Sequence, residues 1–187
     1  MKNFFSFIWE VAKIVIIALA IVVPVRYFLF QPFFVRGQSM EPNFEDGDYL
    51  IVDEISYRFR DPARGEVVVF KFPNDPSQRY IKRIIGLPKE TVTIKNGQVA
   101  ILDENGKKVV LDESKYIAPG VNTSGNLEMI LENDEFFVLG DNRLASSDSR
   151  RWGVLPKENI IGRVLIRAWP FAELNIFAAP QYFENRY

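Results

Sequence analysis

Residues 64–70 read RGEVVVF, in which a short turn at Arg64-Gly65 leads into an apolar run that ends at Phe70. β-Branched and aromatic side chains are typical of strands, and a glycine before them favours a turn. Similar runs, bounded by turn residues, lie on both sides of this one. They occupy residues 49–52, 80–85, 91–94, 98–102, 109–111, 136–139 and 160–169. Asn96-Gly97 and Glu104-Asn105-Gly106 are typical hairpin turns. The pattern predicts a mainly β domain over residues 31–187.

Helical patterns are scarce in this domain. Only residues 156–159 (PKEN) suggest a helical turn, and we find no internal repeat. Residues 112–132 (DESKYIAPGVNTSGNLEMILE) are polar and contain proline and glycine, so they are interpreted as a long loop or small insertion without assigned chemistry.

The N-terminal segment, residues 1–30, is mostly apolar and carries no charge between Ile14 and Val25. At 1.5 Å per residue that core covers roughly 18 Å, against roughly 30 Å of hydrocarbon. A span from about Phe7 to Phe30 fits a bilayer if Lys13 and Arg26 extend toward opposite interfaces. A cleavable signal peptide is the alternative, but bulky residues follow the apolar run instead of a small-x-small cleavage site. We therefore predict one uncleaved transmembrane anchor, whose orientation the flanking charges do not decide.

The composition excludes several kinds of site. A net charge of −1 in 187 residues argues against non-specific attraction to nucleic acid. The sequence contains no cysteine, which excludes disulfides and thiolate zinc sites. It contains no histidine either, which excludes a Ser-His-Asp triad, a Cys-His pair and a His-ligated metal. Any acid–base chemistry must then use Lys, Asp, Glu or Tyr.

One candidate nucleophile is Ser39, in the stretch VRGQSMEPNF of residues 35–44. Gly37 permits a tight backbone geometry close to a substrate, and Pro42 stiffens the exit from the turn. A serine in a turn is also a common structural feature, and its hydroxyl needs a base before it becomes a nucleophile.

The candidate base is Lys82, in the strand-like stretch RYIKRII of residues 79–85. Alternation places Lys82 and Arg83 on opposite faces and does not choose between them. Arginine stays protonated in proteins, whereas a desolvated lysine can lose its proton. Lowering a lysine pKa from about 10.4 to near the working pH corresponds to roughly 3 to 4 kcal/mol, which apolar burial can supply. The alternative is an ordinary surface lysine on a strand.

A third stretch, GDNRLASSDSR over residues 140–150, directly follows an apolar strand. It contains compact polar groups that can pair internally, such as Asp148 with Arg150. This stretch is interpreted either as a solvated polar loop or as a rigid loop beside a functional site.

Together these stretches resemble the type I signal peptidases, membrane-anchored bacterial serine proteases that remove signal peptides from exported proteins. The resemblance runs from the anchor to about Arg163. Four segments carry it: GQSMEPNF (37–44), RGEVVVF (64–70), RYIKRIIGLP (79–88) and GDNRLASSDSRRWG (140–153).

The resemblance implies a role for individual residues. Ser39 corresponds to the acylated nucleophile, and Lys82 corresponds to the neutral general base. Ser146 matches the serine that orients the lysine amine. Asp148 and Arg150 match a supporting ion pair, and Asp141 and Asn142 match positions that brace the site.

Two positions bear on how closely the chain follows this pattern. The Ser39 backbone N–H corresponds to an oxyanion donor, and some family members add a hydroxyl at the position of Gly37. Here glycine supplies no such hydroxyl, so a backbone group or water is left as the second donor. Lys89 stands where glycine is common, which concerns only the local turn.

The implied substrates are signal peptides of preproteins with small residues at −1 and −3 before the cut. Shallow apolar pockets would accommodate these small side chains. The residues expected either to line such pockets or to belong to the hydrophobic core are Phe33, Val35, Met40, Phe44, Tyr80 and Ile81. The implied fold is the coiled antiparallel sheet shared with LexA-type repressors. The family requires no cofactor or metal, and its anchor has a cytoplasmic N-terminus and an extracytoplasmic catalytic domain at the bilayer.

Two other functions are considered. A LexA-like self-cleaving regulator also uses a Ser/Lys pair, but it needs a DNA-binding segment, and residues 1–30 are too apolar for one. A catalytically inactive, membrane-anchored β-domain that scaffolds partners is the second. The joint presence of Ser39, Lys82 and Ser146 argues against it.

Overall fold

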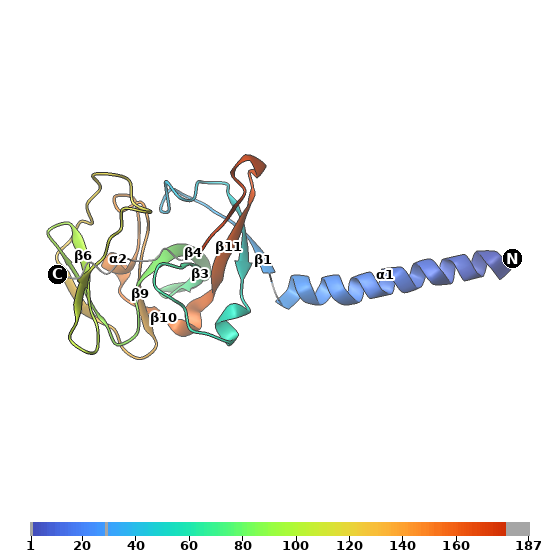
Figure 1. Cartoon of the computed structure of the whole chain (residues 1–187), viewed down its shortest axis with the longest axis horizontal. Helices are drawn as coiled ribbons and strands as arrows, with labels where there is room; N and C mark the ends of the chain where they lie inside the picture. Colours follow the sequence, from blue (N-terminus) through green and yellow to red (C-terminus); the bar gives the residue numbers. More distant parts are fainter. Residues whose placement is uncertain (1, 29, 179–187) are drawn as a thin grey trace.

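A computed structural model describes the backbone of residues 2–28 and 30–178, and the side chains of residues 4, 6–20 and 31–178. The chain begins with one long helix, α1 (Lys2–Phe28), which projects away from a β-rich domain (Figure 1). The strand β1 (Phe30–Phe34) follows it at the near side of that domain.

The larger sheet contains eight antiparallel strands within the described residues. Its order is β1, β2 (Tyr49–Asp53), β11 (Ile160–Trp169), β3 (Val67–Phe72), β4 (Asp75–Gly86), β9 (Glu135–Leu139) and β10 (Leu155–Pro156), with β12 (Asn175–Ile176) paired to β11.

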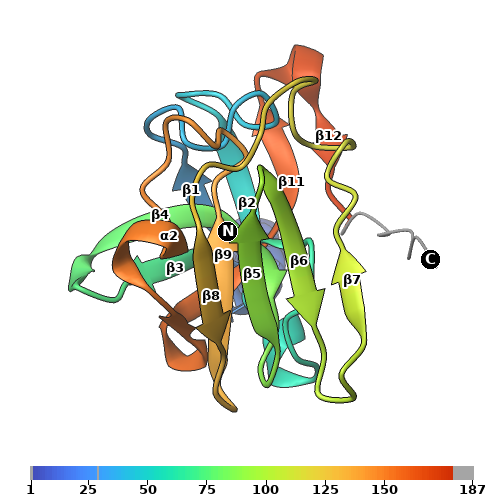
Figure 2. The same cartoon turned by 90° about the vertical axis from the view of Figure 1, so that its left-hand side faces the viewer.

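The smaller sheet has four antiparallel strands and faces the viewer in Figure 2. Its order is β7 (Lys108–Val110), β6 (Gln98–Leu102), β5 (Thr91–Lys95) and β8 (Leu127–Ile130). The remaining elements are single turns: α2 (Ser149–Trp152), η1 (Ser56–Arg58), η2 (Lys157–Asn159) and η3 (Phe171–Glu173).

The predicted mainly β fold is confirmed, and each predicted run corresponds to a strand. The predicted helical turn corresponds to η2. Four strands were not predicted: β1, β8, β10 and β12. β1 contains Pro32, which lacks a backbone N–H and fits only an edge position such as this one. Part of the predicted loop over residues 112–132 is β8, whose Leu127 and Met129 pack against the core of the smaller sheet.

The burial of β4 changes along its length and thereby positions Lys82. Residues 76–79 are exposed, whereas residues 81–86 are buried. β3 pairs with both halves of β4, but β9 pairs with β4 only as far as Arg83, which lies opposite Leu139. The chain that leaves β9 therefore begins its loop close to Lys82, at the point where β4 enters the core.

Among the described residues, no helix combines the length and apolar character that crossing a membrane requires. The apolar part of α1 is preceded by Glu10 and Lys13, and the side chains of residues 21–30, Arg26 among them, lie outside the described ones. The transmembrane anchor over residues 1–30 is thus not supported by the described helix and is taken up below as a proposal.

The turn after β4 explains why glycine suits position 89. Lys89 has a φ of +67°, in the left-handed region that costs a side-chain-bearing residue about 1–2 kcal/mol. Replacing it by glycine removes that cost but adds about 0.5–1 kcal/mol of unfolded-state entropy. We expect Lys89→Gly to raise the free energy of unfolding by up to about 1 kcal/mol in urea titrations. Lys95→Gly, an exposed strand position in β5, should lower it; a loss at both positions would contradict this account.

Candidate active site

Ser39 lies in the loop between β1 and β2, which is closed at its base by backbone hydrogen bonds. The Val35 N–H donates to the Asp48 carbonyl at 2.9 Å, and the Gly47 N–H donates to the Val35 carbonyl at 3.0 Å. Gly37 has a φ of +85°, and its N–H donates to Asp46 Oδ1 at 2.6 Å. The glycine therefore makes the sharp turn that precedes the serine, and Asp46 holds it in place.

The structure brings Ser39 and Lys82 together, although 43 positions separate them in the sequence. Lys82 Nζ lies 2.7 Å from Ser39 Oγ and 2.7 Å from the Ile81 carbonyl oxygen. The lysine side chain is buried, with the residue 3% exposed. A neutral amine in this position donates one N–H to the carbonyl and directs its lone pair at the serine hydroxyl.

Burial is the main cause of an unusual acidity at Lys82. It lowers the lysine pKa from its ordinary value of 10.5 to about 8, because an ammonium ion is poorly solvated there. The charges of Asp148 and Asp141 act in the opposite direction and keep the pKa from falling further. Roughly a tenth of the amine is therefore neutral at pH 7.

The loop after β9 holds the backbone of the serine. The Asn142 N–H donates to the Ser39 carbonyl at 3.1 Å, and its side-chain Nδ2 donates to the Gln38 carbonyl at 3.0 Å. Gly140 packs so tightly against the Ser39 carbonyl oxygen and Ser146 Oγ that a Cβ would collide with both. Asn142 thus lies where a brace for the nucleophile was predicted.

Ser146 is buried beside Gly140, close to the serine loop. Its Oγ has no hydrogen-bond partner among the described groups, so it makes no bond to Lys82 Nζ. This differs from the expected orienting hydrogen bond, and the hydroxyl instead interacts with the Asp148 carboxylate and helps to lower its pKa.

The predicted ion pair between Asp148 and Arg150 is present. Arg150 Nε donates to Asp148 Oδ1 at 2.8 Å, and the Gly140 N–H donates to Asp148 Oδ2 at 3.1 Å. Burial opposes ionisation of the carboxyl, but the hydrogen bond and charge of Arg150 outweigh it and lower the pKa of Asp148. Asp148 therefore stays charged near Lys82 at neutral pH.

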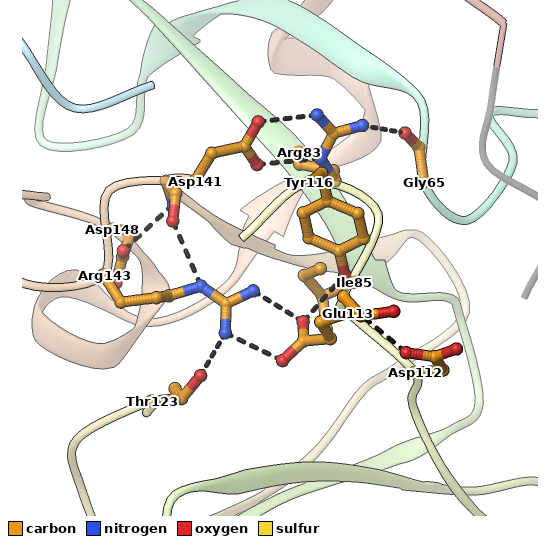
Figure 3. A network of polar contacts seen from close by, with 12 residues as sticks. Gly65, Arg83, Ile85, Asp112, Glu113, Tyr116, Thr123, Asp141, Arg143 and Asp148 are labelled. Atoms are coloured by element: carbon orange, nitrogen blue, oxygen red, sulfur yellow. Dashed lines mark hydrogen bonds and ion pairs between the residues drawn. The ribbon is translucent and has the colours of Figure 1, made fainter. Parts of the chain in front are cut away.

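Asp141 does not contact Ser39 or Lys82 but pairs with Arg83, the residue on the opposite face of β4. Arg83 Nη2 and Nε lie 2.6 Å and 2.8 Å from the two carboxylate oxygens, and Nη1 donates to the Gly65 carbonyl (Figure 3). Asn43 Nδ2 also donates to Asp141, at 2.9 Å. The aspartate thus links β4 to the serine loop.

A third ion pair, Arg143 with Glu113, was not predicted. The arginine side chain is fully buried, and its guanidinium makes two bonds to the Glu113 carboxylate, at 2.5 Å and 2.9 Å (Figure 3). It also donates to Thr123 Oγ1 and, through Nε, to the Gly140 carbonyl at 3.1 Å. The segment after β7, to which no chemistry was assigned, is therefore joined to the loop that holds Ser39.

The backbone around Ser39 leaves one clear candidate for an oxyanion donor. The Ser39 N–H has no acceptor among the described residues. The Gly37 N–H, in contrast, is already bonded to Asp46. Gly37 is thus not placed as the second donor.

A cleft of about 600 Å³ opens above Ser39 and Lys82. Three predicted pocket residues, Phe33, Tyr80 and Ile81, line it. The other three do not. Val35, Met40 and Phe44 are at most 1% exposed and belong to the core under the serine loop. Their apolar character serves packing, which a pattern of hydrophobic residues alone does not distinguish from a pocket.

The cleft also contains residues that sequence reasoning missed. They include Arg36, Val52, Val69, Ser77, Arg79, Ser147 and Ile161. Arg36 and Arg79 each stand three positions before a member of the pair, Ser39 or Lys82, but that spacing alone does not place a side chain in a cleft. Arg83 and Arg143 lay inside the quoted motifs, but their carboxylate partners are distant in sequence.

Comparisons with known proteins agree on one family. The family described as signal peptidase, peptidase S26 matches residues 8–169. A probable signal peptidase I-2 from Synechocystis sp. is 38% identical over 173 residues, covering 89% of this chain and 76% of the relative. A signal peptidase I from Bacillus amyloliquefaciens is 37% identical over 174 residues, covering 89% and 88%.

Among solved structures, the crystal structure of a signal peptidase I from Enterococcus faecalis V583 matches with a TM-score of 0.46 and 28% identity. It covers 56% of this chain and 97% of that one. The breadth of the family match and the identity of the two bacterial relatives place this chain in the signal peptidase, peptidase S26, family.

Proposed function

We propose that this peptidase cleaves N-terminal signal peptides from preproteins by acyl transfer, with Ser39 as nucleophile and neutral Lys82 as general base. The observation that carries the proposal is the 2.7 Å contact between Ser39 Oγ and a buried lysine amine at the floor of the cleft. Nucleophile and base must lie within such a distance for proton transfer.

The reaction proceeds in two halves. Lys82 takes the proton of Ser39 as Oγ attacks the scissile carbonyl, and the Ser39 N–H donates to the developing oxyanion. The lysine then returns the proton to the leaving amine, which gives an acyl-enzyme. A water molecule, deprotonated by Lys82, hydrolyses the ester and releases the signal peptide. The Ser146 hydroxyl makes no bond to Lys82 Nζ in the free protein, and we expect it to turn toward the amine and orient it when a substrate binds.

The supporting residues keep this arrangement rigid. Asp148 and Arg150 hold the loop beside Lys82, Asn142 holds the Ser39 carbonyl, and Asp141 ties that loop to Arg83. Phe33, Tyr80 and Ile81 form apolar walls suited to small residues at −1 and −3.

The test uses a precursor with an Ala-x-Ala site, incubated with detergent-solubilised protein. Mass spectrometry should locate a single cut directly after the second alanine. A matched precursor with leucine in place of that alanine should remain intact. A wild-type protein inert toward all precursors would instead favour an inactive scaffold.

The dependence of activity on pH follows from the acidity of Lys82. The base is active when neutral, so kcat/KM should rise about tenfold per pH unit below pH 8 and level off above it. At pH 7 we expect roughly a tenth of the plateau value. Asp148→Asn removes a charge that raises this pKa, so the rise should move to lower pH. A flat profile between pH 6 and pH 9, measured with a substrate lacking ionisable groups, would contradict the role of Lys82.

The proposal includes a membrane location, with residues 1–30 as a single anchor and residues 31–187 as the extracytoplasmic catalytic domain. α1 exposes large apolar side chains, among them Ile14, Ile16 and Leu19, each more than half exposed. Such side chains are poorly accommodated in water. Protease protection of inverted and right-side-out vesicles tests the orientation.

A further inference from the structure

The arginines of the domain differ in how their charges are balanced. Seven of those described form ion pairs with carboxylates, Arg83, Arg143 and Arg150 among them. Arg36 and Arg79 form no ion pair among the described residues, and both side chains are exposed. The charge of Arg79 acts to lower the pKa of Glu54, but the two side chains do not form an ion pair.

Both unpaired arginines line the cleft that contains Ser39 and Lys82. No aspartate or glutamate belongs to that lining within the described part of the chain. The walls that receive a substrate therefore carry two positive charges that have no ion-pair partner among the described residues. A bound peptide displaces water from the cleft, which strengthens the interaction of these charges with any charge on the peptide.

The position of the arginines indicates where on the substrate they act. Each stands three residues before a catalytic candidate, so at most about 10 Å of chain separates the two, and less for Arg36 because Gly37 turns the backbone. A peptide whose scissile carbonyl lies at Ser39 thus brings side chains within about three positions of the cut near Arg36 or Arg79. A lipid headgroup bound at the same place would occupy the cleft in competition with the peptide, which favours the peptide as the occupant.

We propose that Arg36 and Arg79 select precursors that carry aspartate or glutamate within about three residues of the scissile bond. This inference rests on the proposed function, because it assigns the substrate class of the same cleft. It also predicts that lysine at those positions disfavours cleavage.

The experiment compares peptides with one Ala-x-Ala site and Glu, Gln or Lys placed singly at −2, +1, +2 or +3, so that the small residues at −3 and −1 stay unchanged. Cleavage is measured in non-ionic detergent at low salt. At the most sensitive position we expect kcat/KM for the Glu peptide to exceed that for the Gln peptide about tenfold, with the Lys peptide lower still. Added salt should reduce the ratio.

The variants Arg36→Gln, Arg79→Gln and their combination test the residues themselves. The Glu-to-Gln ratio should approach one in the double variant, whatever its overall rate. Arg151→Gln, an exposed arginine of α2 outside the cleft lining, should keep the wild-type ratio.

Other outcomes have separate meanings. A wild-type ratio near one at every position, with all peptides cleaved, would overturn the inference and leave the proposed function intact. A ratio that appears only after addition of anionic lipid vesicles would overturn it in favour of headgroup binding. Failure to cleave any peptide would overturn the proposed function and this inference together.

Discussion

Replacing Ser39 by alanine, or Lys82 by methionine, is expected to reduce kcat for precursor cleavage by roughly 10⁴-fold or more. Ser39→Ala removes the attacking oxygen, and Lys82→Met removes the proton acceptor while keeping a side chain of similar length. Since both residues serve one step, the double variant should be no worse than either single one. The measurement is single-turnover cleavage of an Ala-x-Ala precursor at pH 9, where the wild-type amine is neutral. Substantial hydrolysis by both single variants would refute the dyad.

The stability of Lys82→Met separates lost chemistry from lost folding. In the folded protein the lysine pKa is lowered from 10.5 to about 8. Below pH 8 the folded state therefore contains a buried, poorly solvated ammonium ion, which is less favourable than the hydrated one of the unfolded chain. This disfavours the folded wild-type protein by about 3 kcal/mol at pH 7, a penalty that falls as pH rises from 8 to 10.5. The methionine variant lacks this penalty. Its free energy of unfolding should equal or exceed that of the wild type at pH 7, with the difference shrinking above pH 8.

Glu113→Ala should be among the most destabilising single substitutions in the domain. It leaves the fully buried Arg143 guanidinium without its carboxylate, which typically costs about 3–5 kcal/mol. In a chain of this size that corresponds to a fall in Tm of roughly 10 °C. Activity should decrease as well, because Arg143 fixes the Gly140 carbonyl, and Gly140 packs on Ser39 and Ser146.

Urea denaturation with matched controls tests this expectation. Glu128→Ala, an exposed glutamate on β8, should change the free energy of unfolding by less than about 0.5 kcal/mol. Combining Glu113→Ala with Arg143→Met removes the unpaired guanidinium charge and should recover much of the lost free energy of unfolding. A Glu113 variant as stable as the Glu128 control would show that the buried pair contributes little.

The strands were predictable where local chemistry decides them. β3 and β5 are rich in β-branched residues and are preceded by turn residues, and their bounds follow from the sequence within one or two positions. β1 and β8 were missed because their stability depends on partners: Pro32 weakens the local signal of β1, and β8 forms by pairing with β5.

The candidate site was predictable only in part. Alternation along β4 left Lys82 and Arg83 equally eligible, and the chemistry of deprotonation together with the family resemblance selected the lysine. The structure gives Arg83 a different task, as the partner of Asp141 across 58 positions. Arg143 and Glu113 are 30 positions apart in the sequence, and no local sequence pattern predicts that they pair. Val35, Met40 and Phe44 were expected as pocket or core, and only the packed fold separates the two.

In the proposed mechanism, the burial of the lysine amine also controls when the molecule becomes able to cut. In a nascent or partly unfolded copy that amine is hydrated and almost entirely protonated, and Ser39, 43 positions away in the sequence, is an ordinary alcohol. Reactivity arises only once β3, β4 and the loop after β9 have closed around it. Under that mechanism a copy able to hydrolyse a peptide has finished folding, and immature molecules would not cleave one another or their neighbours.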